Sequence, residues 1–380
     1  MKYKVIIVGG GASGLMLASL LPKNTALVIE SNAKVAAKVL VSGGGKCNIT
    51  NSKMGAEYFL AEEAFISPAL KKFNEKSLLT WLSRQGLEPE IRKESQYFCK
   101  HTAKELVDIL IKESKKQSTH VNEQVVSATK KGDTFFVKTN KTIYQCQHLV
   151  IASGGLSFPK LGASSIGYDL ATSFGHSVTK TAPALVGFTV QKEQFFFKEL
   201  SGASCDVEIH VNDKICSGAL LFAHKGISGP AVLDASLFWE KRKMQIDFLP
   251  DFNWKTIKDS KKNISTLLPL PKRITKAFLL QLSLHDKPFN KMNLEEIEKL
   301  KVLNAYIFSP AGTFGYSRAE VTKGGIDTNE INKETMMSKK EDALYCLGEV
   351  LNVTGKLGGY NFQWAFSSAY MCSRYLKGKI

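Results

Sequence analysis

Three glycines near the amino end stand at the spacing that binds the pyrophosphate of a dinucleotide. Gly9, Gly11 and Gly14 form a G-x-G-x-x-G pattern directly after the apolar run at 3–8. The first glycine of this pattern permits a tight turn, the second lets the backbone approach the phosphates, and the third lets a helix pack closely on a strand. The helix that begins there offers unpaired N–H groups and partial positive charge to the phosphates.

An acidic residue, Glu30, ends the next apolar run, at 26–29. A carboxylate at this place accepts hydrogen bonds from the ribose hydroxyls of the adenosine half and would repel a 2′-phosphate. The motif therefore favours FAD or NAD over NADP as the bound dinucleotide.

Later glycine-containing segments favour FAD over NAD. Residues 151–155 (IASGG) and Gly348-Glu349 each end an apolar run far from the first. An extended dinucleotide needs the chain to return and hold its ribityl and flavin ends, and Glu349 can bond the ribityl or phosphate region. Residues 358–361 (GGYN) precede the last predicted helix and can bring N–H groups to the N1–C2=O edge of a flavin, where a helix N-terminus stabilises the reduced anion.

Five longer motifs follow one another in a fixed order along the chain. They are SGGGKCNITN at 42–51, FAHKGISGP at 222–230, VTKGG at 321–325, GEVLNVTG at 348–355 and GGYNFQWA at 358–365. In these motifs the chain resembles, over essentially its whole length, the BaiN/YhiN flavoproteins, also described as an aminoacetone oxidase family of FAD-binding enzymes. The resemblance implies a two-dinucleotide-binding-type flavoprotein, in which both chain ends form the FAD domain around an inserted β-barrel-plus-helices domain. One characterised branch of the family reduces conjugated enone double bonds in bile-acid intermediates.

The motifs and the resemblance together predict the residues that hold FAD. The predicted set is Gly9, Gly11, Ala12, Ser13, Gly14, Glu30, Lys38, Ser42, Gly44, Gly45, Lys46, Cys47, Asn48, Val126, Ala152, Ser153, Gly154, Gly348, Glu349, Gly359, Tyr360 and Asn361. The chain departs from the family pattern where Ala36-Ala37 precedes Lys38 in place of Gly-Arg, and where Lys46 replaces an arginine. A lysine keeps the charge but lacks the planar fork that binds phosphate or ribityl oxygens in a bidentate manner.

Three residues are weak candidates for the chemical step, and each has a structural alternative. Cys47 has no second cysteine at C-x-x-x-x-C spacing, which disfavours dithiol exchange and favours a buried cysteine packing on the cofactor. His224 can act as an acid or a base toward the flavin, or it can be a structural loop histidine. Tyr360 can flank the flavin or donate a proton, or it can pack the last helix together with Trp364.

The elements that must position these residues alternate between strand and helix at both ends of the chain. Buried strands are predicted at 3–8, 26–29, 148–151 and 343–347, and helices at 15–21, 71–85, 102–116 and 363–376. Between these ends the pattern changes to alternating strands over 187–250 and a lysine-rich helical segment over 254–306. The sequence thus predicts an α/β fold: a Rossmann-like FAD-binding domain, 1–186 plus 321–380, interrupted by a β-barrel and helical substrate domain at 187–320.

Composition excludes several other classes of protein. The 380 residues are 44% hydrophobic and 23% charged, as in a soluble globular protein of two domains. We find neither an apolar stretch long enough to cross a membrane nor a signal-peptide pattern. Seven scattered cysteines without C-x-x-C spacing argue against a disulfide framework or a structural zinc. The histidines and carboxylates show no metal-ligand spacing. We therefore expect no metal and a cytoplasmic location.

The charge is the unusual feature of the composition. There are 51 basic and 35 acidic residues, a net charge of +16, but no block of five like charges. Scattered lysines favour a solvated surface over a nucleic-acid partner without excluding one. We therefore expect an FAD-dependent oxidoreductase that transfers hydride to an unsaturated or carbonyl-conjugated small molecule, with NAD(P)H as a transient donor. The alternatives are a flavin-dependent tRNA-modifying enzyme, which would use the charge, and a non-catalytic FAD-binding redox sensor.

Overall fold

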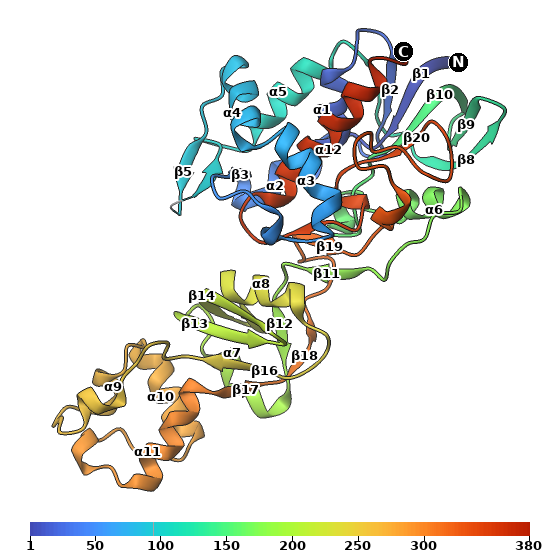
Figure 1. Cartoon of the computed structure of the whole chain (residues 1–380). Helices are drawn as coiled ribbons and strands as arrows, with labels where there is room; N and C mark the ends of the chain where they lie inside the picture. The colour runs from blue at the N-terminus through green and yellow to red at the C-terminus, as the bar shows by residue number, and fades with distance from the viewer. Residues whose placement is uncertain (94) are drawn as a thin grey trace. The chain divides into compact units, whose positions relative to one another are not determined.

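The chain folds as two compact units. The computed structural model describes residues 1–93 and 95–380. Unit 1 contains Met1–Pro183 and Glu320–Ile380, and unit 2 contains Ala184–Ala319. Unit 1 thus combines the two ends of the chain, and Figure 1 shows the blue helix α1 (Ala12–Leu20) beside the red helix α12 (Tyr360–Leu376).

A sheet with a parallel centre forms the middle of unit 1. Its strands run in the order β7-β2-β1-β10, and β20 pairs with the second half of β10. These strands are all parallel, whereas the β8–β9 hairpin is antiparallel to the first half of β10. The bounds are β1 Lys2–Val8, β2 Ala26–Ile29, β7 Ser118–His120, β8 Val125–Lys131, β9 Thr134–Thr139, β10 Ile143–Ile151 and β20 Leu344–Cys346.

The parallel strands end level with one another. Val8, the last residue of β1, lies opposite Ile29 of β2 and Ile151 of β10, and Ile151 lies opposite Cys346 of β20. The β-branched run of β1 is buried on both faces, as parallel sheets require. The segments that follow these strands therefore start at one edge of the sheet, where α/β folds bind their ligands.

Helices cover this sheet, and α1 packs against both α5 and α12. The remaining helices of unit 1 are α2 Ala37–Val41, α3 Glu63–Lys72, α4 Glu75–Arg84, α5 Lys104–Ser114 and α6 Ile166–Ser173. The predicted helices at 15–21 and 102–116 correspond to α1 and α5. The helix predicted over 71–85 corresponds to α4 but begins later than predicted, because α3 ends at 72 and α4 begins at 75, where the Asn74 side chain accepts the Ser77 N–H at 2.9 Å. The last helix begins at Tyr360, three residues before the predicted start, directly after Gly359.

A small antiparallel sheet, β3-β6-β5, also belongs to unit 1. Its strands are β3 Asn48–Asn51, β5 Glu90–Arg92 and β6 Gln96–Phe98. Two further strand pairs are β4 Phe59–Leu60 with β21 Thr354–Gly355, and β11 Ala182–Ala184 with β19 Val321–Lys323. The first of these pairs joins the segment after β3 to the segment before α12.

Unit 2 contains an antiparallel sheet in the order β17-β16-β13-β14-β15-β12-β18. Its two end strands are separated in sequence by a single residue, Ser309, so the sheet curves almost into a barrel. The strands are β12 Phe188–Val190, β13 Ser204–Val211, β14 Lys214–Ala223, β15 Gly226–Ser228, β16 Met244–Asp247, β17 Tyr306–Phe308 and β18 Pro310–Thr313. This arrangement confirms the predicted combination of a Rossmann-like fold with an inserted barrel-like element.

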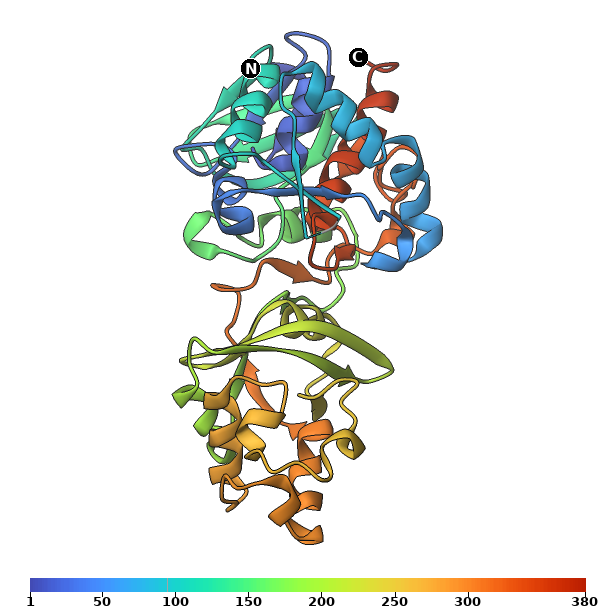
Figure 2. The same cartoon turned by 90° about the vertical axis from the view of Figure 1, so that its left-hand side faces the viewer.

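Helices lie on both sides of the unit 2 sheet. Within this unit, Figures 1 and 2 show α8 on one side and α9, α10 and α11 on the other. The helices are α7 Phe196–Glu199, α8 Pro230–Phe238, α9 Ile264–Leu267, α10 Lys272–Gln281 and α11 Leu294–Leu300. Phe197 is fully buried in their aromatic core, and its ring packs against those of Phe222, Phe278 and Phe308. Among the described residues, every helix falls short of the length and apolarity needed to cross a membrane.

A half-buried ionic network joins the segment before β11 to the loops that follow β19 in unit 1. The Glu330 carboxylate accepts hydrogen bonds from the Ser177 N–H at 2.8 Å and from His176 Nδ1 at 3.0 Å, and it pairs with Lys340 Nζ at 2.6 Å. Burial alone would raise the pKa of Glu330, but the hydrogen bonds from Lys340, Ser177 and His176 outweigh it and lower the pKa to about 2. The ionised carboxylate therefore stabilises the fold.

We expect Glu330→Gln to lower the free energy of unfolding at pH 7 by about 2 kcal/mol, because several hydrogen bonds to a charge are weakened. The contribution of Glu330 is complete above its ordinary pKa of 4.5 and is lost as the pH falls toward about 2. The difference between wild type and variant should therefore shrink below pH 4.5 in urea unfolding curves. Glu334→Gln, on an exposed residue nearby, is the control. Equal losses in the two variants would contradict the assignment.

Candidate functional site

The turn after β1 is built by glycines that the protein's own packing requires. Gly9 has φ +108°, and a Cβ there would lie 2.5 Å from the Ala152 carbonyl oxygen. A Cβ on Gly14 would lie 2.0 Å from the Gly9 carbonyl oxygen, so α1 touches the end of β1. These two positions hold the loops after β1 and β10 together and set the start of α1.

Gly11 differs from Gly9 and Gly14, the other two glycines of the motif. It has φ −85°, which any residue can adopt, and a Cβ there would meet nothing within 4 Å. It stands at the N-cap of α1 without a side-chain cap, so the first N–H groups of the helix lack partners within it. Packing does not require this glycine. The backbone here is open to an anionic group of another molecule, as a pyrophosphate site needs.

Glu30 lies beside this turn at the end of β2. Its buried carboxylate accepts the Gly10 N–H on Oε2 at 2.9 Å, and the Asn32 N–H on Oε1 at 2.8 Å. These bonds fix the carboxylate next to the turn, in the place where a ribose would follow a bound pyrophosphate. Its bond to a ribose stays a prediction.

Glu349, after β20, is tied to three other segments. Lys38 Nζ lies 2.8 and 3.1 Å from its two carboxylate oxygens, and the Thr322 N–H donates to Oε1 at 2.9 Å. A Cβ on Gly155 would lie 2.9 Å from the same oxygen. Because Lys38 balances the charge of Glu349, a phosphate that comes near would meet an ion pair instead of a bare carboxylate. Gly348 stands next to α1, since a Cβ there would lie 2.8 Å from Ser13 Oγ.

The segment at 42–51 meets the segment at 358–361. The Asn51 side chain donates to the Gly358 carbonyl at 3.0 Å, and a Cβ on Gly359 would lie 2.7 Å from Thr50 backbone atoms. Gly44 and Gly45 have φ of +65° and +85°, and a Cβ on either would meet nothing within 4 Å. The structure thus joins the two motifs predicted to hold the flavin, and one of them has an open backbone.

A buried acceptor without a partner lies at this junction. Asn48 donates through Nδ2 to Gln96 Oε1 at 2.7 Å, while its Oδ1 is buried with no hydrogen-bond partner among the described residues. That Oδ1 would be 2.8 Å from a Cβ on Gly359, the N-cap of α12, which has no side-chain cap. A flavin ring carries an N–H donor and carbonyl acceptors. An unpaired amide oxygen beside a helix N-terminus that has no side-chain cap therefore fits such a ring.

The side chains of several other predicted FAD residues are committed to the protein. Asn361 exchanges two hydrogen bonds with the Gly355 backbone, both at 2.9 Å, so its backbone N–H is the group available for a ligand. Ser42 donates to the Val39 carbonyl at 2.7 Å. Val126 is half-exposed at the irregular start of β8. Ala12 lies in the first turn of α1, while Ser153 and Gly154 follow β10.

The three candidates for the chemical step occupy different surroundings. Cys47 is fully buried, and this burial raises the pKa of its thiol to about 12. Tyr360 is buried with its ring stacked on Tyr58 at a centroid distance of 4.7 Å. His224 is exposed in the turn between β14 and β15 of unit 2. Trp364 donates to the Gly348 carbonyl at 3.1 Å and packs α12, as in its structural alternative.

Two contributors were not singled out from the sequence. Thr322 donates its N–H to Glu349, and its hydroxyl oxygen accepts the N–H groups of Leu156 and Ser157. It lies within the VTKGG motif, which was the available signal. No sequence motif pointed to Gln96, the hydrogen-bond partner of Asn48.

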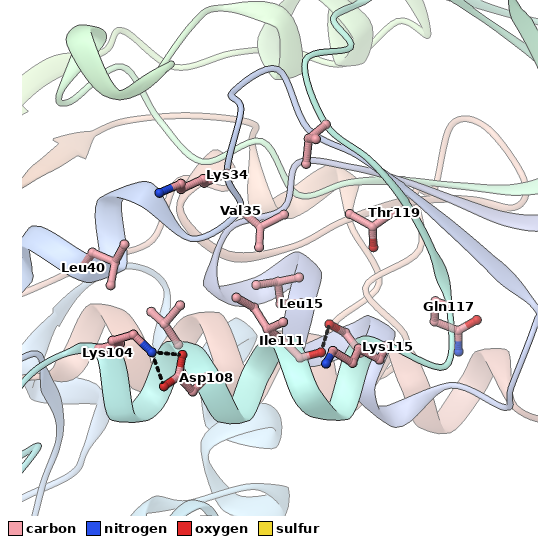
Figure 3. A pocket seen from close by; sticks show the side chains of 13 residues that line it. Leu15, Lys34, Val35, Leu40, Lys104, Asp108, Ile111, Lys115, Gln117 and Thr119 are labelled. Atoms are coloured by element: carbon pink, nitrogen blue, oxygen red, sulfur yellow. Dashed lines mark hydrogen bonds and ion pairs between the residues drawn. The ribbon is translucent and has the colours of Figure 1, made fainter.

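A pocket of about 540 Å³ lies elsewhere in unit 1, between α1, α5 and the segment at 34–40. Figure 3 shows Leu15, Val35 and Ile111 at its wall and the Lys104–Asp108 ion pair at one side. No residue of the predicted FAD set lines it. It nevertheless borders the turn after β1, because a Cβ on Gly10 would lie 2.8 Å from Val35 Cγ1.

Open glycine backbone at the level ends of parallel strands defines a dinucleotide-binding protein of the Rossmann type. The chain belongs to the HI0933-like protein Rossmann domain family, whose model matches residues 3–375. This result confirms the predicted BaiN/YhiN type of flavoprotein oxidoreductase.

Relatives and solved structures agree with this family. The chain is 36% identical over 388 residues to a ribosomal RNA dihydrouridine synthase of Haemophilus influenzae, covering 97% of each chain. It is 36% identical to the Escherichia coli protein of the same name, covering 98% of each. It is 27% identical to a 3-dehydro-bile acid delta(4,6)-reductase of Clostridium scindens, again covering 98% of each. A variant of E. coli quinol fumarate reductase FrdA shares the fold at a TM-score of 0.53 and 12% identity, with 100% of this chain and 70% of that chain covered.

We expect Gly11→Ala to weaken FAD binding by about 10- to 100-fold, because a methyl group would stand in the open path of the pyrophosphate. Thermal stability should stay close to that of the wild type, since the methyl group meets no protein atom. Gly14→Ala is the contrasting variant and should unfold or aggregate. Titration calorimetry with FAD and thermal melts check both. Unchanged FAD affinity in folded Gly11→Ala protein would contradict the assignment.

Proposed function

We propose that this protein is an FAD-dependent reductase of a carbonyl-conjugated C=C bond and that its substrate is uridine in ribosomal RNA. The carrying observation is the convergence of four strand ends on one edge with open glycine backbone and an unpaired Asn48 oxygen. The 36% identity to two ribosomal RNA dihydrouridine synthases supports the substrate.

The chemistry named for the relatives is of one kind. Dihydrouridine is uridine with its C5=C6 bond saturated, and that bond is conjugated to the C4 carbonyl. A bile-acid delta(4,6)-reductase, the name of the C. scindens relative, also acts on unsaturated carbon bonds. An enzyme that adds hydride to one carbon and a proton to its neighbour suits both substrates.

Different residues of unit 1 would bind different parts of FAD. The N-terminus of α1 at Gly11 holds the pyrophosphate, and Glu30 holds the adenosine ribose. Gly44, Gly45 and Asn48 hold the flavin from one side, and the N-terminus of α12 holds it from the other. Bound FAD would supply hydride transfer between NADH or NADPH and the conjugated carbon.

The proton that completes the reduction must come from a group other than the flavin. A fully buried thiol with a pKa of about 12 is a poor acid, so we assign Cys47 to packing. The stacking on Tyr58 assigns Tyr360 to packing as well. Of the three candidates, His224 is the exposed one, and we propose it as the acid.

We propose that unit 1 is the FAD-binding domain and that unit 2 is the substrate domain. Unit 1 contains every residue of the predicted FAD set. Unit 2 interrupts it as an independent sheet with its own aromatic core, the arrangement expected of an inserted element that selects the substrate. The net charge of +16 suits a polyanionic substrate.

A small conjugated enone is the second candidate substrate, favoured by the C. scindens relative at 27% identity. It was also the leading expectation from the sequence. The two candidates share the cofactor and the reaction and differ only in the substrate.

The test begins with the visible spectrum of the protein reconstituted with FAD. Anaerobic NADH or NADPH should bleach the flavin bands, and unmodified transcripts of the ribosomal RNAs should then restore them. Nucleoside mass spectrometry should find uridine that has gained two hydrogens. Bleaching with restoration by a conjugated enone and not by RNA would move the proposal to the second candidate. Failure to bind FAD would overturn both.

We expect Cys47→Ala to keep the rate of dihydrouridine formation, whereas loss of a true general acid costs about 10²- to 10⁴-fold. The reason is that burial keeps this thiol from solvent and raises its pKa to about 12. Single-turnover oxidation of the reduced flavin by RNA measures this step directly. Cys346→Ala, on another buried cysteine, controls for lost packing. A hundredfold slower step in Cys47→Ala alone would restore Cys47 as a catalytic residue.

A further inference from the structure

The small sheet β3-β6-β5 gathers three cations from separate parts of the chain. Lys46 directly precedes this sheet, Arg92 ends β5, and Lys100 follows β6. The Cys99 N–H donates to the Lys46 carbonyl at 3.0 Å, and Glu90 lies opposite Phe98 across the β5–β6 pair. These pairings bring the three cations to the same part of unit 1.

The cations surround a single carboxylate. The hydrogen bond from Arg92 holds the pKa of Glu90 below its ordinary value, and the charges of Lys46 and Lys100 add to this effect. Lys100 is exposed, while Lys46 and Arg92 are half-exposed. A second carboxylate, Glu105, accepts the N–H groups of His101 and Thr102 beside Lys100. The three cations still outnumber these two carboxylates and leave this patch net positive.

The same sheet forms one side of the proposed flavin site. The Phe98 ring would lie 3.3 Å from a Cβ on Gly43, next to the open glycines at 44–45. Gln96 accepts from Asn48 and would lie 3.4 Å from a Cβ on Gly358. Within unit 1, the patch and the flavin-binding segments are therefore neighbours.

A base in folded RNA must leave its stack before a flavin can reach its C5=C6 bond. The extruded nucleotide stays attached to phosphates on both sides, and these remain at the mouth of the site. Anionic groups in that place need cations. Nε and Nη2 of Arg92 already donate to Glu90, which leaves the N–H groups of Nη1 for a phosphate. The Arg92 guanidinium lies 5.8 Å from the centre of the Phe98 ring, which supports its plane.

We propose that Lys46, Arg92 and Lys100 form an RNA-docking patch, which binds the phosphates flanking the uridine that is reduced. This inference rests on the proposed function and deepens it by naming the surface that holds the RNA backbone. The phosphates of NADPH have the same chemistry, so the experiment must separate the two ligands.

The experiment compares two FAD-loaded double variants that each lose two positive charges. Arg92→Ala with Lys100→Ala removes part of the RNA-docking patch. Lys2→Ala with Lys4→Ala is the matched control, because both lysines are exposed on β1, toward the end of the strand opposite the Gly9 turn. Binding to unmodified ribosomal RNA transcripts is measured by fluorescence anisotropy between 50 and 200 mM salt, ionic conditions over which phosphate contacts are strongly screened. FAD affinity and thermal melts confirm that both variants are folded.

We expect the patch variant to bind RNA at least about 10-fold more weakly. The magnitude of its slope of log affinity against log salt should fall by about 1.4 to 1.8, the change expected from the loss of two phosphate contacts. Dihydrouridine formation at limiting RNA should fall in proportion, while the rate of flavin reduction by NADPH stays unchanged. The control variant should match the wild type in all three measurements.

Three results would overturn this inference. Equal losses in both variants would mean diffuse attraction by net charge. A raised KM for NADPH with unchanged RNA affinity would assign the cations to the donor. RNA binding and turnover at wild-type levels in the patch variant would leave the cations without this role, although the proposed function would stand. If the wild-type protein itself forms no dihydrouridine, the proposed function has failed first.

Discussion

The level ends of the parallel strands are the constraint on which the site depends. Val8 lies opposite both Ile29 and Ile151, and Ile151 lies opposite Cys346. A shift of this register would separate the Gly9 turn from Glu30, from the loop after β10 and from Gly348. Because β1 is buried on both faces, its apolar side chains hold that register. The positions of the groups proposed to bind the pyrophosphate, the ribose and the ribityl chain all depend on this alignment.

The glycines at this edge serve two different physical purposes. Gly9 and Gly14 are required by the protein, since a Cβ on either would collide with backbone atoms. Gly11, Gly44 and Gly45 are not required by packing, because a Cβ on them would meet nothing. Packing leaves this backbone open, although the positive φ of Gly44 and Gly45 by itself favours glycine there. Beside uncapped helix N-termini and an unpaired Asn48 oxygen, the open backbone is shaped for another molecule.

Local patterns were enough to predict the centre of the fold and much of the candidate site. Short β-branched runs marked β1, β2 and β10, and the glycine spacing placed the turn before α1. The pairs that join distant segments carried no such signal. Lys38 and Glu349 lie 311 positions apart, and Asn48 meets Gln96 only because β3 pairs with β6. The break between α3 and α4 was missed because apolar spacing continues across Asn74, whose side chain caps the second helix.

The central claim is that FAD lies along this edge, from the Gly9 turn to the N-terminus of α12. Hydrogen–deuterium exchange of the protein with and without FAD tests it most directly, because the groups concerned are backbone N–H groups. The account predicts that FAD slows exchange in the first turns of α1 and α12 and in the segment at 43–48. Slowed exchange at the pocket residues Val107, Ile111 and Thr119, with none at those three places, would contradict it.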